Sequence, residues 1–135
     1  MTTMEPDTET PSRKRVLCIE DEHFISELYV RALTKAGYEV DVQLDGIKGL
    51  AAAQTDTYDI ILLDLMIPGA TGIEVLRVLR DPTKTPKLRA KIIITTNLEQ
   101  RDDARADIEQ QADGYIVKAE ITPHELVAFL SHLDG

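Results

Sequence analysis

In this 135-residue sequence, a set of acidic, hydroxyl and cationic side chains stands at the ends of several apolar runs. If the fold brings them together, they could form a reactive or ligand-binding site. The set is Glu20, Asp21, Asp64, Thr96 and Lys118. An ionised carboxylate at the end of an apolar run is costly unless water or a cation reaches it. Grouped carboxylates repel one another, which raises at least one pKa unless a divalent cation binds. Oxygen ligands suit Mg²⁺ better than zinc, and Mg²⁺ beside a free carboxylate and a lysine suits binding or accepting a phosphoryl group.

Apolar runs alternate with helical patterns, and these elements must position the set. Runs typical of strands cover residues 15–20, 38–43, 59–64, 91–96 and 114–118. Helical spacing of apolar residues predicts helices over 24–36, 47–53, 73–79 and 98–111, and a last one after Thr122. Continuous aliphatic strands belong in a parallel sheet covered by helices on both faces. Ligands of such sheets bind at the carboxyl ends of the strands, so we expect the set to meet at one edge.

The helix boundaries carry their own signals. Gly37 is expected to end the first helix, because glycine is common just past a helix C-terminus. Thr71 and Thr122 are expected to cap the helices that follow them. The segment 98–111 is polar, but Ala104, Ile108 and Ala112 fall at i, i+4 and i+8, so we expect a weakly anchored helix.

Apolar residues of the first two helices, Phe24 and Ile47 among them, are expected to face the core. A basic group around the loop 81–90 is expected to be solvated. Its members are Arg80, Lys84, Lys87, Arg89 and Lys91.

Composition limits the function classes. The net charge of −9 disfavours nucleic acid as a direct partner, because phosphate binding requires a basic face. No apolar run is long enough to span a membrane, and the single Cys18 lies in an apolar run and fits a reducing cytoplasm. Residues 1–13 predict a disordered tail, and residues 14–135 predict one domain.

Four blocks of the sequence resemble those of the response regulator receiver domain. They are VLCIEDE, DIILLDLMIPGATG, IIITT and GYIVKAE, in the family's order and at its separations, over about residues 14–133. No block is specific alone, but the four together are. The resemblance implies a flavodoxin-like α/β fold, (βα)5 and doubly wound, with five parallel strands in the order 2-1-3-4-5. It also implies a stand-alone receiver in two-component signalling.

The resemblance implies roles for the acidic residues. Asp64 would accept a phosphoryl group from a sensor histidine kinase or a phosphotransfer protein. Glu20, Asp21 and Asp64 would hold Mg²⁺, with the backbone carbonyl of Met66 as a further ligand. No organic cofactor is expected, and the chain would catalyse only its own phosphorylation and dephosphorylation.

Three further residues follow from the same resemblance. Thr96 would bind a phosphoryl oxygen and act as a switch, and Lys118 would pair with the phosphoryl group or with Asp64. Tyr115 matches the aromatic residue that turns inward when the family's threonine moves. An unknown downstream protein would detect the change, and a homodimer through the face of strands four and five is a further option.

Two residues depart from the family's pattern. Asn97 stands where a small residue is usual, and Ala119 stands where a proline is usual. These departures keep open a pseudo-receiver that signals by protein contacts without phosphorylation. A small nucleotide or flavin protein is the other alternative, but EDEHF occupies the place of the glycine-rich loop that it would need.

Each site residue also has a purely structural interpretation. Asp64 could cap the turn after its strand, and Glu20 and Asp21 could be acids favoured near a helix N-terminus. Lys118 could be a solvated lysine, and Tyr115 could be half-buried packing. A structure decides between these interpretations by showing whether the side chains meet.

Overall fold

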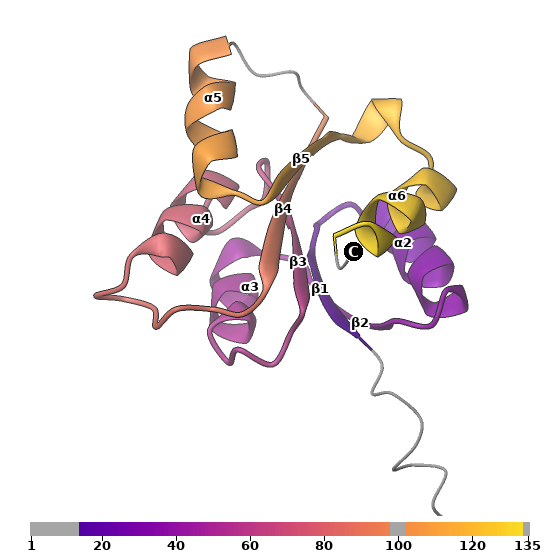
Figure 1. The fold of residues 1–135 in the computed structure, drawn as a ribbon, viewed down its shortest axis with the longest axis horizontal. Helices are drawn as coiled ribbons and strands as arrows, with labels where there is room; N and C mark the ends of the chain where they lie inside the picture. Colours follow the sequence, from indigo (N-terminus) through magenta and orange to yellow (C-terminus); the bar gives the residue numbers. More distant parts are fainter. Residues whose placement is uncertain (1–13, 98–101, 134–135) are drawn as a thin grey trace, which may run out of the picture.

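The computed structural model describes residues 14–97 and 102–133, and its strands form one parallel sheet in the order β2-β1-β3-β4-β5 (Figure 1). The strands are β1 (Arg15–Ile19), β2 (Glu39–Gln43), β3 (Ile60–Asp64), β4 (Lys91–Thr96) and β5 (Gly114–Val117). The predicted flavodoxin-like fold and strand order are confirmed. The predicted tail, residues 1–13, and residues 98–101 of the predicted polar helix lie outside the described residues.

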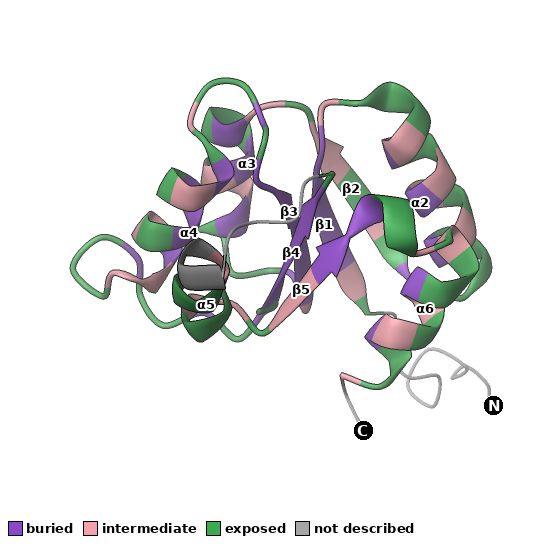
Figure 2. Cartoon of the chain, turned by 90° about the horizontal axis from the view of Figure 1, so that it is seen from above, coloured by how far each residue is buried: buried purple, intermediate pink, exposed green. Residues whose placement is uncertain are grey.

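Helices cover both faces of the sheet, as the aliphatic strands predicted (Figures 1 and 2). On one face lie α2 (His23–Lys35) and α6 (Pro123–Ser131). On the other lie α3 (Gly46–Ala53), α4 (Gly72–Arg80) and α5 (Asp102–Gln111), and a short 3-10 turn, η1 (Lys118–Glu120), joins β5 to α6. Within the described part of the chain, no helix is both long and apolar enough to cross a membrane.

Alternation along the strands divides the core into two layers. In β1, Val16 and Cys18 pack with α2 and α6, whereas Leu17 and Ile19 pack with the helices of the opposite face. Every position of β3 is buried, as expected of a strand covered on both sides. Figure 2 shows the mostly buried central strands β1, β3 and β4 between helices whose outer sides are exposed, while the edge strand β2 is more exposed.

The predicted helix signals are present. Thr71 caps α4 and Thr122 caps α6, and each threonine forms a capping box with the glutamate three residues later. Gly37 follows the end of α2 with a φ of +104°, a conformation that glycine adopts without a steric penalty. Asp45, which had no predicted role, caps α3 by accepting a hydrogen bond from the backbone N–H of Lys48 at 2.8 Å.

The prediction that Phe24 and Ile47 face the core is wrong. Phe24 is 73% exposed and Ile47 is 66% exposed. Each lies in the first turn of its helix, at the carboxyl edge of the sheet, whereas buried α2 residues such as Tyr29 and Leu33 lie further along the helix. Helical periodicity does not show where the sheet beneath a helix ends.

The prediction of a solvated side chain is also wrong for Arg80, which ties α4 to the connection between α5 and β5. Its Nε donates to the carbonyl oxygen of Gln111 at 2.6 Å, and its Nη2 pairs with Asp113 Oδ2 at 2.9 Å. The same Asp113 oxygen accepts a hydrogen bond from the backbone N–H of Ile92 at 2.8 Å. The other members of the basic group, Lys84, Lys87, Arg89 and Lys91, are exposed.

Candidate functional site

The carboxyl ends of β1 and β3 bring two carboxylates together. Ile19 pairs with Leu63 in the parallel register, so the next residues along the two strands, Glu20 and Asp64, are neighbours. Glu20 is 1% exposed and Asp64 is 2% exposed. Buried carboxylates are stable only beside a cation or hydrogen-bond donors, so the site must contain a compensating group.

Lys118, directly after β5, is the cation beside both carboxylates. Its Nζ donates to Glu20 Oε1 at 2.8 Å and to Asp64 Oδ2 at 3.1 Å. Its side chain is only 2% exposed, so Lys118 is not a solvated lysine. The structure therefore brings together residues 98 and 54 positions apart in the sequence.

Asp21 joins these residues to form a group of three carboxylates. One oxygen from each of Glu20, Asp21 and Asp64 lies within 4.8 Å of the others. The group carries more negative charge than the single ammonium of Lys118 can balance. This donor set, all carboxylate oxygen, fits a hard divalent cation such as Mg²⁺.

The backbone after β3 fixes the orientation of Asp64. The N–H of Met66 donates to Asp64 Oδ1 at 2.9 Å, while Lys118 holds Oδ2. The Met66 side chain is 61% exposed and does not pack in the core. Its backbone carbonyl, expected as a metal ligand, follows Asp64 closely in the chain and stays a prediction.

Electrostatics at the site are strongly perturbed. Burial raises the pKa of Glu20 from its ordinary 4.5 to about 7, against the opposing effect of the hydrogen bond from Lys118. Burial alone would lower the pKa of Lys118, but the hydrogen bond to Glu20 and the nearby Asp64 charge raise it above its ordinary value. Lys118 is therefore charged at neutral pH, as a group that compensates buried carboxylates must be.

A close approach of α4 supports the backbone of Asp64. A Cβ atom at Gly72 would lie 2.4 Å from the carbonyl oxygen of Asp64 and 2.5 Å from Leu65 Cα. The N–H of Gly72 donates to the carbonyl oxygen of Leu65 at 3.2 Å. Only glycine fits there, and the turn before it uses Gly69 at a φ of +88°. The PGATG stretch thus brings the capped start of α4 directly against the end of β3.

Thr96 and Tyr115, the expected switch residues, lie on adjacent strands next to α5. Thr96 is 0% exposed and pairs with Val117 in the register, while Tyr115 pairs with Ile94 and is half-buried. The guanidinium of Arg105 lies 4.4 Å from the centre of the Tyr115 ring, a cation–π distance. Tyr115 therefore links β5 to α5.

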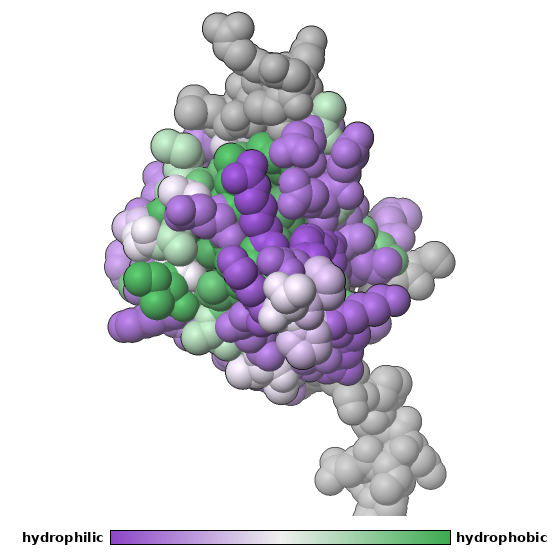
Figure 3. All heavy atoms as spheres, turned by 90° about the vertical axis from the view of Figure 1, so that its left-hand side faces the viewer, coloured by the Kyte–Doolittle hydropathy of each residue, from purple (hydrophilic) through white to green (hydrophobic). Residues whose placement is uncertain are grey.

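α5 itself is lightly anchored, in agreement with its polar sequence. Of residues 105–111, whose side chains the structure describes, only Ile108 is buried. Figure 3 shows the face of the molecule that carries α3, α4 and the described part of α5. Hydrophilic side chains predominate on this face, and apolar ones show between them. A helix that buries so little can shift at low cost in free energy.

Sequence reasoning missed one residue of the site, Glu22. Its Oε1 accepts hydrogen bonds from Lys118 Nζ at 3.2 Å and from Asn97 Nδ2 at 3.3 Å. The hydrogen bond from Lys118, and then that from Asn97, lowers the pKa of Glu22. The only signal in the sequence was that Glu22 completes the acidic triplet EDE, which gives no direction for its side chain.

The two departures from the family's pattern lie beside the site. Asn97 is exposed and contacts Glu22, and Ala119 is exposed within η1, the 3-10 turn that follows β5. Lys118 is the first residue of this turn, so the predicted strand 114–118 ends one residue early, at Val117.

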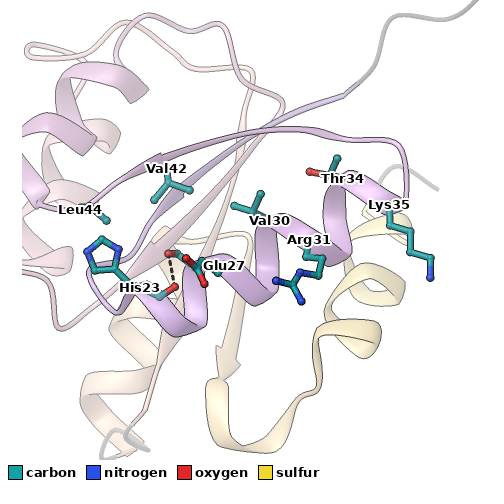
Figure 4. A pocket seen from close by; sticks show the side chains of 9 residues that line it. His23, Glu27, Val30, Arg31, Thr34, Lys35, Val42 and Leu44 are labelled. Carbon is teal, nitrogen blue, oxygen red and sulfur yellow. Dashed lines mark hydrogen bonds between the residues drawn. The ribbon is translucent and has the colours of Figure 1, made fainter.

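A groove of about 770 Å³ lies along α2 and the edge strand β2 (Figure 4). Its sides include Val30 of α2 and Val42 of β2, and His23 lines it at the start of the helix. None of its lining residues is Glu20, Asp21 or Asp64. The groove is therefore separate from the acidic site.

Comparisons with known proteins agree with this geometry. The family model of the response regulator receiver domain matches residues 16–131. Response regulator ArlR of Staphylococcus saprophyticus is 39% identical over 104 residues, which are 77% of this chain and 45% of ArlR. The chain thus spans about half the length of the curated relatives it matches.

Solved structures show the same fold. The chemotaxis response regulator CheY4 of Vibrio cholerae matches with a TM-score of 0.77 and 28% identity, over 90% of this chain and 98% of CheY4. A CheY-like response regulator receiver domain protein from Methanospirillum hungatei JF-1 matches with a TM-score of 0.75 and 26% identity, over 90% of this chain and 93% of that chain.

Proposed function

This chain belongs to the response regulator receiver domain family, and we propose that it accepts a phosphoryl group on Asp64. The donor is a sensor histidine kinase or a phosphotransfer protein, and Mg²⁺ is required. One observation carries the proposal: the buried ammonium of Lys118 contacts the buried carboxylates of both Asp64 and Glu20. Buried charges of this kind cost stability, and strongly perturbed ionisable groups gather at functional sites.

Asp64 acts as the nucleophile. One carboxylate oxygen forms a bond to phosphorus while the bond from phosphorus to the donor's leaving atom breaks, and the leaving group keeps that electron pair. The contacts from Met66 N–H and Lys118 Nζ hold the two oxygens in fixed positions before the reaction. Lys118 and the Thr96 hydroxyl stabilise the negative charge on the transferred oxygens.

Glu20, Asp21 and Asp64 are the proposed ligands of Mg²⁺, with the Met66 carbonyl as a further oxygen. When bound, Mg²⁺ offsets the negative charge on the transferring phosphoryl oxygens. The chain's own part is to gather the carboxylates and to bury those of Glu20 and Asp64. Beyond phosphorylating and dephosphorylating itself, the domain catalyses nothing.

The output of phosphorylation is a changed surface at β4 and β5. A phosphoryl group on Asp64 draws Thr96 toward it and favours one of two positions of Tyr115 and α5. Tyr115 is suited to this because it contacts Arg105 of α5 directly. A downstream protein, or a second copy of the chain, detects this face.

A pseudo-receiver that signals without phosphorylation is the second candidate. The observation that favours it is the hydrogen bond from Asn97 to Glu22 beside the acidic site, at a position where the family usually has a small residue. A magnesium titration separates the two candidates. Binding in the millimolar range or tighter supports the phosphoacceptor, and no binding supports the pseudo-receiver.

The function is tested by measuring intact mass after incubation with acetyl phosphate and Mg²⁺. The wild type should gain one phosphoryl group, and the Asp64→Asn variant should gain none. Chelating Mg²⁺ should prevent the gain in the wild type. Asp59→Asn is the matched control, because Asp59 lies at the opposite end of β3 and should not affect labelling. Equal labelling of wild type and Asp64→Asn would remove Asp64 from the mechanism.

A further inference from the structure

We propose that Glu22 is a positioning residue that holds Lys118 and Asn97 until a phosphoryl group arrives; this inference rests on the proposed function. A single oxygen of Glu22 accepts hydrogen bonds from both side chains, at 3.2 Å from Lys118 Nζ and 3.3 Å from Asn97 Nδ2. Glu22 thereby joins the start of α2 to the ends of β4 and β5.

The contact between Glu22 and Lys118 matters because the ammonium of Lys118 has a limited number of hydrogen-bond donors. An ammonium has three N–H donors, and Lys118 Nζ already has three carboxylate partners, Glu20 at 2.8 Å, Asp64 at 3.1 Å and Glu22 at 3.2 Å. A phosphoryl oxygen on Asp64 needs a donor from the same ammonium. One of the three carboxylates must therefore give up its hydrogen bond.

The exposure of each side chain decides which carboxylate gives up its hydrogen bond from Lys118. The Glu22 side chain is 50% exposed, whereas those of Glu20 and Asp64 are 1% and 3% exposed. Water can replace the lysine at the exposed Glu22 carboxylate whether or not Mg²⁺ is bound, whereas a buried carboxylate with no cation beside it bears the full cost of desolvation. Glu22 is therefore the partner that Lys118 releases.

The helix start supports a role for this side chain outside α2. Glu22 is the N-cap residue of α2, and its side chain makes no capping hydrogen bond to the helix, which leaves the carboxylate to Lys118 and Asn97. Its backbone N–H donates instead to Glu20 Oε2 at 3.1 Å. Both the backbone and the side chain of Glu22 thus serve the acidic site.

Glu22 and Asn97 both lie at the exposed side of a site whose acceptor is buried. The charge of Glu22 opposes an approaching phosphate, and its carboxylate competes with that phosphate for Lys118. Removing the charge should therefore speed phosphorylation of Asp64. Once Lys118 has released Glu22, Asn97 at the end of β4 still donates a hydrogen bond to the Glu22 carboxylate.

The test is the rate of labelling by acetyl phosphate in the Glu22→Gln variant. Glutamine keeps the size and can still accept from Asn97, but it removes the charge. The rate constant should rise about threefold, the size of effect expected when one exposed ion pair is lost. The gain should shrink in high salt, which a merely structural effect would not do. Glu27→Gln, on the same helix and outside the site, should label at the wild-type rate.

Two further measurements separate this role from others. If Glu22 and Asn97 act through one contact, the effect of Glu22→Ala combined with Asn97→Ala should be smaller than the product of the single effects. The Mg²⁺ dissociation constant of Glu22→Gln should stay within about threefold of wild type, whereas a rise of about tenfold or more would make Glu22 a metal ligand and overturn the inference.

Equal rates for wild type, Glu22→Gln and Glu27→Gln would also overturn the inference. That result differs from a failure of the proposed function, in which the wild type itself would gain no phosphoryl group.

Discussion

Charged side chains gather at both ends of the sheet, but in different settings. At the amino end, Arg15 pairs with Asp41 at 3.0 Å, and its guanidinium lies 4.6 Å from the centre of the Tyr58 ring. The side chains of Arg15 and Asp41 are 36% and 50% exposed. At the carboxyl end, one ammonium, that of Lys118, faces several carboxylates, and Glu20 and Asp64 are almost fully buried.

The difference separates structural charges from functional ones. The amino-end group is solvated, so it adds modestly to stability and creates no demand for a ligand. The carboxyl-end group has excess negative charge in a buried place, which destabilises the chain unless a cation binds. An arrangement of this kind is expected where a metal and a phosphoryl group are to be received.

Replacing the buried lysine should have the largest effect. In Lys118→Met, labelling by acetyl phosphate should fall about a hundredfold, because a donor to the developing charge is lost. Without Mg²⁺, the free energy of unfolding should fall by about 3 kcal/mol, since buried carboxylates lose their partner. Mass spectrometry and urea denaturation measure the two effects.

The control for this variant is Lys91→Met, at the exposed start of β4. It should label as the wild type does. Addition of Mg²⁺ should restore part of the lost stability of Lys118→Met, because the cation binds only the folded acidic group. Labelling of Lys118→Met at the wild-type rate would show that the carboxyl end does not differ from the amino end in function.

Two glycine substitutions test whether the chain is packed more tightly at the carboxyl end of the sheet than at the amino end. Gly72→Ala places a Cβ against the backbone of Asp64 and Leu65, and we expect a loss of about 3 kcal/mol in the free energy of unfolding. Gly37→Ala at the end of α2 meets no atom within 4 Å, so only its φ of +104° is unfavourable and the loss should be about 1 kcal/mol. Equal losses in denaturant titrations would contradict the tight packing of α4 on Asp64 and Leu65.

The pH dependence of stability should further distinguish the buried carboxyl end of the sheet from the solvated amino end. Burial raises the pKa of Glu20 to about 7 from an ordinary 4.5. A folded-state pKa above the unfolded one gives stability that is complete below the unfolded pKa and lost as the pH rises through the folded pKa. Without Mg²⁺, the contribution of Glu20 to the free energy of unfolding should therefore fall between about pH 4.5 and pH 7.

Urea titrations across this range, with a chelator or with Mg²⁺, measure the effect. Glu20→Gln should abolish this part of the pH dependence, and Mg²⁺ should reduce it because the cation binds the charged form. An increase in the contribution of Glu20 over the same range, in the absence of metal, would contradict its burial among carboxylates.

Arg15 should show the smallest effect. In Arg15→Met, the free energy of unfolding should fall by about 0.5–1 kcal/mol, as is usual for an exposed ion pair. Labelling by acetyl phosphate should not change. A labelling defect in this variant, measured by intact mass, would mean that charges at the amino end also serve the chemistry.

The sequence was sufficient for the sheet and for the meeting of the acids. Continuous aliphatic runs predicted buried parallel strands, and in such a sheet the residues after each strand share one edge. That rule brings Glu20, Asp64 and Lys118 together without any knowledge of the side-chain positions.

Other features depend on tertiary contacts that local patterns do not encode. Phe24 has helical periodicity but lies at the edge of the sheet, and Arg80 has a loop-like setting but reaches a carbonyl oxygen at Gln111. Glu22 was missed because its contacts depend on where the ends of β4 and β5 lie relative to the start of α2.

The most direct measurement is to locate the phosphoryl group. Labelled protein is treated with borohydride, which reduces an aspartyl phosphate to homoserine, and its peptides are then analysed by mass spectrometry. The account predicts homoserine at residue 64 and at no other position. Homoserine at another aspartate, with residue 64 unchanged, would contradict it.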